Sequence, residues 1–287
     1  YTPTVTKVTP TSTPATSTGL QGQPQSGSPV FTPGNPEVPM DDSVPMTFED
    51  GSSTKTVPNV GVYTINPDGS ITFTPDKQYV GTPAPVTVKR VDKNGTEVTA
   101  TYTPTVTKVT PTSKDDTSTG VQGQPQTGTP VFMPGDPAVP IDLDSPMTFE
   151  DGQPTKTVPG VGEYSINPDG SITFTPDKQY VGTPAPVTVK RVDKNGTEVT
   201  ATYQADVKAA SPTGQDTQTV GLQGQLQTSQ LNFTPGQATV NNQTQTVPLN
   251  PAGPQFVVDG QVQQGNTLTV SDASGKVQGT YTVKPNG

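Results

Sequence analysis

A tandem repeat of 101 residues constrains this chain more than any other feature of its sequence. Residues 1–12 read YTPTVTKVTPTS, and the same twelve letters return at residues 102–113. The 38 residues from Ile65 to Tyr102 are identical to those from Ile166 to Tyr203. Solenoid repeats are about 20–45 residues long, whereas a domain of about 100 residues folds around a core of its own. The repeat therefore predicts a string of separate domains.

A third copy begins in register and then shortens. The segment Gly19-Leu20-Gln21-Gly22-Gln23 returns at residues 221–225, and Phe31-Thr32-Pro33-Gly34 returns at residues 233–236. From these signals we expect four parts: residues 1–15 as the tail of a preceding repeat plus a connector, residues 16–109 as repeat 1, residues 110–210 as a connector plus repeat 2, and residues 211–287 as a connector plus a shortened, divergent terminal repeat.

Stretches rich in Thr, Ser and Pro separate the repeats. They run over residues 10–18, 111–119 and 211–219 and contain almost no bulky apolar residue. Proline favours extended, polyproline-like geometry. We expect short Pro/Thr-rich connectors that join the domains end to end, and an irregular segment over residues 1–13.

Within a repeat the pattern is that of β-strands. Thr, which favours strands, contributes 51 residues. Apolar and polar residues alternate on both sides of Asn66-Pro67-Asp68-Gly69, a strong turn sequence, which predicts a hairpin. Lys93-Asn94-Gly95 predicts a second hairpin with a two-residue Asn-Gly turn. The fold class we predict is all-β, with tandem antiparallel β-sandwich domains of immunoglobulin-like form.

Only 28% of the residues are hydrophobic, which predicts a thin core in each domain. Such a domain has modest stability. The expected core residues of repeat 1 are Val30, Phe31, Phe48, Tyr63, Ile65, Ile71, Phe73, Val86, Val88, Val98 and Tyr102.

The composition removes most catalytic chemistry. The chain has no His and no Cys, so it lacks the usual general base near neutral pH, thiol nucleophiles and Cys/His zinc sites. A Ser or Thr hydroxyl without an activating base is only a polar side chain. The formal net charge of −9 argues against nucleic acid and membrane surfaces as partners. We expect no enzyme, no cofactor, and no catalytic, cofactor-binding or metal-binding residues.

Three alternatives to this purely structural interpretation have residues that suggest them. Acidic residues gather at Asp41-Asp42, Glu49-Asp50 and Asp68 and could supply calcium ligands, although turns explain them better. Lys89 or Lys77 could form an amide crosslink with Asn66 or Asn94, but solvated lysines are favoured. Tyr63 and Tyr79 could form a sugar-binding platform, but sparse aromatic residues are more often core.

The repeats resemble those of CshA-type fibrillar adhesins of streptococci. The resemblance rests on Gly-x-Gln-Gly-Gln, on Gly-x-Ile-x-Phe-Thr-Pro-Asp, and on residues 81–88 running into residues 92–96. It covers both full units and, more loosely, the third. It implies a surface protein that is secreted, carries its adhesive region N-terminal to the repeats, and is attached covalently to the peptidoglycan cell wall. The departure of the third unit from the repeat pattern suggests that it is the end of the array, next to the wall anchor.

Two functions from different classes follow. In the first, the repeats are a structural stalk that projects the adhesive region away from the cell. They then have no direct partner and are monomeric, and the parent protein binds host matrix or other microbes through a region outside this chain. In the second, each repeat holds a weak site for a host protein or glycan and gains by multivalency. Each full repeat carries one Arg, Arg90 or Arg191, and binding surfaces are usually richer in Arg and aromatic residues, so the stalk is favoured.

Overall fold

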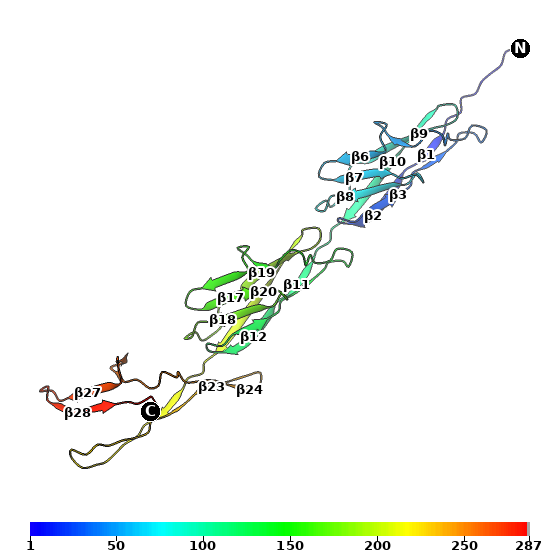
Figure 1. Ribbon diagram of the computed structural model, residues 1–287. Helices are drawn as coiled ribbons and strands as arrows, with labels where there is room; N and C mark the ends of the chain where they lie inside the picture. Colours follow the sequence, from blue (N-terminus) through cyan, green and yellow to red (C-terminus); the bar gives the residue numbers. More distant parts are fainter. Residues whose placement is uncertain (286–287) are drawn as a thin grey trace. The chain divides into compact units, whose positions relative to one another are not determined.

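The computed structural model describes residues 1–285, and these residues contain strands β1 to β28 and no helix (Figure 1). Among them there is therefore no helix long and apolar enough to cross a membrane. The chain divides into two compact units, which we describe separately. The first comprises Tyr1–Asp115, Pro130–Gly152 and Thr188–Thr202, and the second comprises the other described residues. All ten strands of the first repeat belong to the first unit.

The first repeat is a β-sandwich of two four-stranded sheets, in the strand orders β2-β10-β9-β5 and β3-β8-β7-β6, with an additional β1-β4 pair. Its strands are β1 (Thr11–Thr13), β2 (Ala15–Leu20), β3 (Gln25–Gly27), β4 (Val30–Thr32), β5 (Thr47–Phe48), β6 (Thr54–Val57), β7 (Gly61–Ile65), β8 (Ile71–Pro75), β9 (Val86–Val91) and β10 (Glu97–Thr107). The predicted all-β sandwich is confirmed.

The first predicted hairpin forms as the turn sequence requires. Ile65 of β7 faces Ile71 of β8, and the N–H of Gly69 donates to the carbonyl of Asn66 at 3.0 Å. Gly69 has a φ of 82°, a left-handed conformation that glycine adopts without strain. The alternation on both sides of the turn then directs one face of each strand into the core.

The core lies between the two sheets and contains most of the predicted residues. Phe48, Tyr63, Ile71, Phe73, Val86, Val88 and Tyr102 are buried, whereas Phe31, Ile65 and Val98 are partly buried. Val30 was assigned to the core wrongly, because its side chain is 55% exposed. It lies in β4, which pairs only with β1, and there only Phe31 turns toward the core. Ala15, Met46, Ala100 and Val106 complete the core.

The β9–β10 loop differs from the predicted two-residue turn. Gly95 has a positive φ of 77°, but Asn94 does not, so the turn lacks the two left-handed residues that an Asn-Gly turn of that kind needs. The N–H of Gly95 donates to the carbonyl of Asp92, and the N–H of Asp92 donates to the carbonyl of Thr96. This is a three-residue loop that ends in a glycine bulge.

The connector prediction over residues 10–18 was wrong. Thr11–Thr13 form β1 and Ala15–Leu20 form β2, and residues 112–114 and 116–121 form the corresponding strands of the second repeat. Only residues 108–111 lie between the last strand of the first repeat and the first strand of the second. Residues 1–10 contain no strand, as we expected for that part of the chain.

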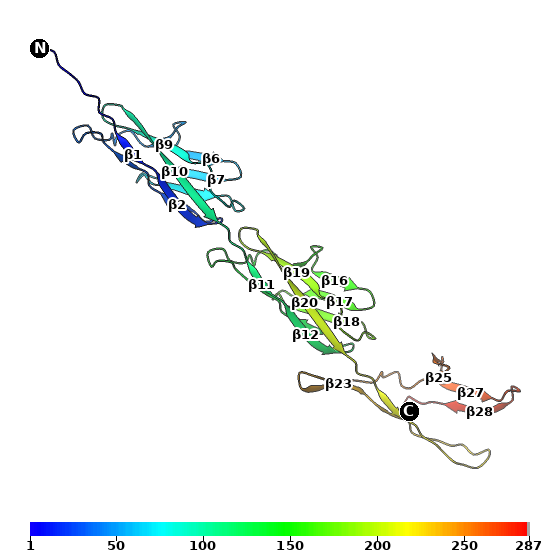
Figure 2. The same ribbon diagram turned by 180° about the vertical axis from the view of Figure 1, so that it is seen from behind.

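β2 also departs from the antiparallel prediction, because it runs parallel to β10. Six residue pairs are in register, from Ala15 with Tyr102 to Leu20 with Thr107. β2 lies at the edge of its sheet and beside the last strand of the repeat in both views of the ribbon (Figures 1 and 2). The first and last long strands of the repeat are therefore neighbours.

The second repeat has the same strand pairings. β12 pairs with β20 in parallel over six positions, and β13, β18, β17 and β16 form a sheet in that order. Its strands are β11 (Thr112–Lys114), β12 (Asp116–Val121), β13 (Gln126–Gly128), β14 (Val131–Met133), β15 (Thr148–Phe149), β16 (Thr155–Val158), β17 (Gly162–Ile166), β18 (Ile172–Pro176), β19 (Val187–Val192) and β20 (Glu198–Lys208).

The remaining segment contains four two-stranded antiparallel pairs. Many of its large apolar side chains, such as Leu226, Phe233 and Tyr281, are exposed. Its strands are β21 (Thr213–Gln215), β22 (Asn232–Thr234), β23 (Gly236–Val240), β24 (Gln243–Val247), β25 (Val257–Val258), β26 (Gln261–Val262), β27 (Thr267–Ser271) and β28 (Val277–Thr282).

Candidate functional site

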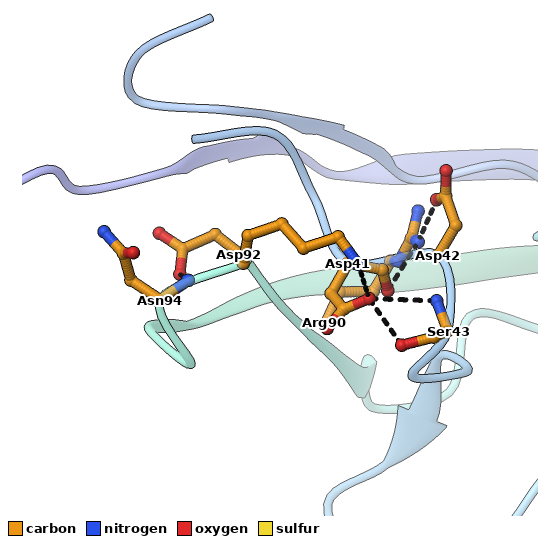
Figure 3. Close-up of polar contacts among 7 residues, drawn as sticks. Asp41, Asp42, Ser43, Arg90, Asp92 and Asn94 are labelled. Carbon is orange, nitrogen blue, oxygen red and sulfur yellow. Dashed lines mark hydrogen bonds and ion pairs between the residues drawn. The ribbon is translucent and has the colours of Figure 1, made fainter. Parts of the chain in front are cut away.

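The densest group of charged side chains in the first repeat lies where the loop before β5 meets the β9–β10 hairpin. The backbone joins the two elements, because the N–H of Asp41 donates to the carbonyl of Val91 and the N–H of Lys93 donates to the carbonyl of Pro39, each at 2.9 Å. Figure 3 shows Asp41 and Asp42 on the loop facing the basic side chains of the hairpin. We call this group the hairpin cluster; its residues are Asp41, Asp42, Ser43, Arg90, Asp92, Lys93 and Asn94.

Asp41 is the centre of this cluster. One of its carboxylate oxygens, Oδ1, lies 2.5 Å from Nζ of Lys93 and accepts from both the N–H and the Oγ of Ser43, at 3.0 and 2.6 Å. The hydrogen bond from Lys93, followed by those from Ser43, lowers the pKa of Asp41 to about 2. Beside it, Nη2 of Arg90 lies 2.7 Å from Oδ1 of Asp42. Asp41 and Asp42 therefore each have a cationic partner.

Asp92 occupies a different environment, because its side chain is completely buried. Its Oδ1 accepts from the N–H groups of Asn94 and Thr96, at 2.9 and 2.8 Å, and thereby shapes the loop. Its Oδ2 is buried and has no hydrogen-bond partner among the described residues. Figure 3 shows Asp92 beside Asn94 and apart from Asp42.

The second repeat rebuilds the cluster with different carboxylates. Lys194 lies 2.5 Å from Asp142 and 2.7 Å from Asp144. The pKa of Asp142 is lowered to about 2, chiefly by the hydrogen bond from Lys194. Leu143 stands at the position of Asp42, so the ion pair that Arg90 makes in the first repeat cannot form with this residue.

Three of the acidic residues that we considered for calcium accept hydrogen bonds within turns. Asp41, Asp50 and Asp68 each accept from the N–H and the Oγ of the serine two positions later. These bonds lower the pKa of Asp50 and of Asp68. Within residues 1–285, no three acidic side chains gather as a group that could hold a metal ion. The arrangement fixes loops, as Asx turns do.

The groups that we considered for a crosslink also have other partners. Nζ of Lys89 lies 3.6 Å from Glu97 across the β9–β10 pair. The amide of Asn66 donates to the hydroxyls of Ser70 and Thr72, both at 2.8 Å. Lys89 and Asn66 are therefore each paired with a residue other than one another.

The tyrosine platform is part of the core. The ring of Tyr63 stacks on Phe73 with centroids 4.5 Å apart and meets Tyr102 edge to face at 6.2 Å. Tyr63 is completely buried, and Tyr79 packs against the core from its edge. The alternative of a sugar-stacking surface at Tyr63 was therefore wrong, since a buried ring presents no face to a ligand.

Sequence reasoning missed a polar network inside the sandwich. Ser17 of β2 donates its hydroxyl to Oε1 of Gln25 at 2.6 Å, and its Oγ lies 2.6 Å from the hydroxyl of Tyr102. Because the single proton of Ser17 is committed to Gln25, Tyr102 is the donor in the second bond. Nε2 of Gln25 then donates to the carbonyl of Thr105 at 3.1 Å. The network joins β2, β3 and β10.

The arrangement of these groups is suited to fixing loops and strands in place rather than to catalysis. The hairpin cluster pairs carboxylates with cations, and the buried network pairs hydroxyls with amides. In the hairpin cluster the hydroxyl of Ser43 donates to Asp41, but a carboxylate whose pKa is lowered to about 2 is a weak base and activates a hydroxyl poorly. The buried carboxylate of Asp92 also fixes a loop, because its Oδ1 accepts from the loop backbone.

Solved structures that match this chain include a repeat of a fibrillar adhesin and tandem β-domains. The NMR structure of repeat domain 13 of the fibrillar adhesin CshA from Streptococcus gordonii is 70% identical over 24% of this chain and 90% of that chain, with a TM-score of 0.16. Tandem β-domains are more distant: titin z1z2 in complex with telethonin is 17% identical over 72% of this chain and 100% of that chain, with a TM-score of 0.38. The fibronectin(III)-like modules of CbhA from Clostridium thermocellum are 16% identical over 71% of this chain and 95% of theirs, with a TM-score of 0.24. No curated protein matches the chain.

The family comparison covers almost the whole sequence. The family described as the surface adhesin CshA repetitive domain matches residues 7–106, 108–207 and 209–287. These three matches follow the 101-residue period, and the expected resemblance to CshA-type repeats is confirmed. The chain belongs to the CshA repeat family and is a repeat region of a fibrillar surface adhesin.

Proposed function

We propose that these repeats are the stalk of a cell-surface adhesin, in which each folded repeat is a spacer. The observation that carries the proposal is the parallel pairing of β2 with β10. In a parallel pair, the start of one strand and the end of the other lie at opposite ends of the ladder. The chain therefore enters each full repeat at one end and leaves it at the other, so each repeat adds its length to the array.

The added length follows from the longest strand. β10 has 11 residues, and at about 3.3 Å per residue it extends over about 36 Å. Residues 108–111 leave little slack between consecutive repeats. Each repeat of about 100 residues therefore extends the array by a fixed length.

The charged groups of the first repeat support a spacer over an enzyme. The carboxylates of Asp41 and Asp42 form ion pairs within the repeat. Tyr63 and Tyr102 are buried in the core. Non-enzymatic, monomeric repeats without a direct partner fit these features. In the proposal, the parent protein is secreted, attached covalently to peptidoglycan, and binds host matrix or other microbes through a region outside this chain.

The competing function is a multivalent binding module, for which one candidate surface in the second repeat is a shallow, open depression lined by Gly160 and residues 177–181. Its lining includes Tyr180, which could stack on a ligand, but no cluster of Arg or aromatic residues of the kind that anchors interfaces. We therefore give the stalk first place.

Small-angle X-ray scattering of the whole chain tests the proposal. A compact 100-residue domain has a radius of gyration near 13 Å, so three in line should reach a maximum dimension of about 100 Å or more. The measurement is made at low concentration, with and without a chelator. Immobilised host matrix proteins serve as the parallel binding assay.

A maximum dimension of about 60 Å, the value for three packed domains, would contradict the stalk proposal. So would a dimer at low concentration. Saturable binding of the chain to a matrix protein would favour the binding module instead. A change in dimension on adding chelator would reopen the calcium alternative.

A further inference from the structure

The parallel pair of terminal strands has a mechanical consequence. We call β2 and β10 together the terminal clamp of the first repeat. They are in register from Ala15 with Tyr102 to Leu20 with Thr107, and the N–H of Gln21 extends the ladder by a 2.8 Å bond to the carbonyl of Thr107. Figure 2 shows the two strands side by side along the repeat.

Tension along the chain loads this ladder lengthwise. A pull on the segment before β2 and on the segment after β10 draws the two strands in opposite directions along their own axes. All bonds of the ladder then resist together. A pull on both strands from the same end would open the bonds one after another, and each backbone hydrogen bond is weak by itself. The direction of loading therefore decides the resistance.

The C-terminal half of β10 is attached mainly through the clamp. β9 pairs with β10 only from Glu97 to Tyr102. Beyond that point β10 has β2 on one side and a single bridge on the other, in which Val106 and Gly81 exchange two bonds of 2.9 Å. Force that enters at Thr107 therefore reaches the sandwich through β2.

The backbone alternation leaves the ladder intact despite a proline in it. Since Val106 directs its N–H and carbonyl toward Gly81, Thr105 and Thr107 direct theirs toward β2. Pro104, which has no N–H, lies two residues before Val106 and so faces the same side as Val106. The proline removes no donor from the clamp.

Side chains reinforce the clamp from within the sandwich. Tyr102 of β10 donates to Ser17 of β2, and Ser17 donates to Gln25, whose amide donates to the carbonyl of Thr105. Just before β2, the hydroxyl of Ser12 donates to the carbonyl of Thr99 at 2.6 Å. The two strands are thus bonded through backbone and side chains.

The second repeat has the same device. β12 and β20 are in register from Asp116 with Tyr203 to Val121 with Lys208, and the N–H of Gln122 donates to the carbonyl of Lys208 at 2.9 Å. The described residues of the last segment form only antiparallel two-stranded pairs. They contain no terminal clamp.

We propose that the terminal clamps make the two full repeats resistant to tension, so that they stay folded under a force that unfolds the last segment. The inference rests on the proposed stalk function, because an adhesin under flow transmits tension through its stalk. It adds a specific property to that function: strong resistance to force along the chain and weak resistance in other directions.

Force spectroscopy on the whole chain, pulled between two cysteines introduced into repeat 1, tests the clamp. The chain has no Cys, so each attachment point is unique. Thr13→Cys with Lys108→Cys loads the clamp lengthwise, and Thr13→Cys with Glu97→Cys opens it from one end. All three positions are exposed. We expect a several-fold higher unfolding force in the first geometry, with a length gain of about 300 Å from the 95 released residues.

A matched pair of variants probes the ladder itself. Thr105→Pro removes a backbone donor that faces β2, whereas Thr105→Ala removes the same side chain and keeps the donor. We expect Thr105→Pro to lower the unfolding force when the clamp is loaded lengthwise and to leave the unfolding force unchanged when the clamp is opened from one end. Thr105→Ala should alter neither unfolding force. Thermal unfolding of each variant first establishes that it is folded, and the comparison of directions in the parent sequence does not depend on either variant.

Equal unfolding forces in the two directions would overturn the clamp. A wild-type lengthwise force in folded Thr105→Pro would do the same. Either result leaves the maximum dimension from scattering unaffected, so failure of the clamp is distinguishable from failure of the stalk. Pulling the whole chain by its ends should also show two strong events, after the last segment has unfolded at low force.

Discussion

Removing the hydroxyl group from either of two tyrosines in the core of the first repeat should change the stability of that repeat, in opposite directions for the two residues. The hydroxyl of Tyr102 donates to Ser17 at 2.6 Å. The hydroxyl of Tyr63 is equally buried and has no hydrogen-bond partner among the described residues. Burial raises the pKa of both phenols above their usual value. Phenylalanine at either position keeps the ring and its stacking and removes only the hydroxyl.

The expected magnitudes follow from the two environments. Tyr102→Phe removes one satisfied bond and should destabilise the first repeat by about 1 kcal/mol. Tyr63→Phe removes a polar group that is desolvated without compensation, and should stabilise it by about 1 kcal/mol. For a domain of about 100 residues, each change corresponds to a shift in Tm of about 4–8 °C, in opposite directions.

Differential scanning calorimetry of the whole chain measures both shifts. The second repeat, which neither substitution touches, provides an internal reference transition. Tyr203→Phe is the matched control there, because Tyr203 also bonds a serine, Ser118, at 2.6 Å; it should lower the second transition and leave the first. If Tyr63→Phe lowers the first transition as much as Tyr102→Phe does, the hydroxyl of Tyr63 has a partner and the argument from its burial is wrong.

Four further substitutions test other parts of the structure. Phe73→Ala should cost about 3–5 kcal/mol in denaturant unfolding, because its ring is completely buried; a loss below about 1 kcal/mol would contradict its place in the core. Gly95→Ala should destabilise by about 1–2 kcal/mol because Gly95 is left-handed, whereas Asn94→Ala should have little effect, and equal losses would restore the two-residue turn. The pKa of Asp41 is lowered from 3.8 to about 2 by Lys93, so its stabilisation is complete above pH 3.8 and is lost as the pH falls toward 2. Asp41→Asn should therefore lower Tm at pH 7 and have a much smaller effect at pH 2, and an equal loss at both pH values would contradict the ion pair.

Local sequence signals predicted the hairpins and most of the core. The alternation at Ile71 and Phe73 determines which face of β8 is buried, and Asp68 and Gly69 satisfy the turn from within four residues. Both signals act over short distances, so a single sequence contains all the information they need. Val30 was misplaced because alternation alone cannot tell a strand inside a sheet from one that pairs only with β1.

The connector error has a different cause. Residues 11–20 have few apolar side chains because β2 is an edge strand that contributes only Ala15 to the core. Its stability comes from backbone pairing with a strand more than 80 residues away. Composition cannot show such a partner. The buried Gln25 was missed for the same reason, since Ser17 and Thr105 satisfy its amide only in the folded repeat.

The β9–β10 loop shows how one buried carboxylate can override a strong local motif. Asn94-Gly95 by itself favours a two-residue turn. The Oδ1 of Asp92 accepts hydrogen bonds from the N–H groups of both Asn94 and Thr96, and this geometry needs the longer loop. The competing interaction was present in the sequence, two residues before the motif, but its strength depends on the burial of Asp92.

The two terminal clamps show why sequence identity is a poor guide to the mechanical part of this protein. Identity between the full repeats ends at Tyr102, where the parallel ladder begins: residues 103–107 read TPTVT, and residues 204–208 read QADVK. The register is nevertheless the same, because the ladder is made by backbone groups. Thr82 bonds the hydroxyl of Thr105 at 2.9 Å, and Thr183 bonds the carboxylate of Asp206 at the same distance. The exposed side chains of the clamp are therefore free to diverge while its resistance to tension is preserved, and this divergence also lowers the risk that near-identical neighbouring repeats exchange their last strands during folding.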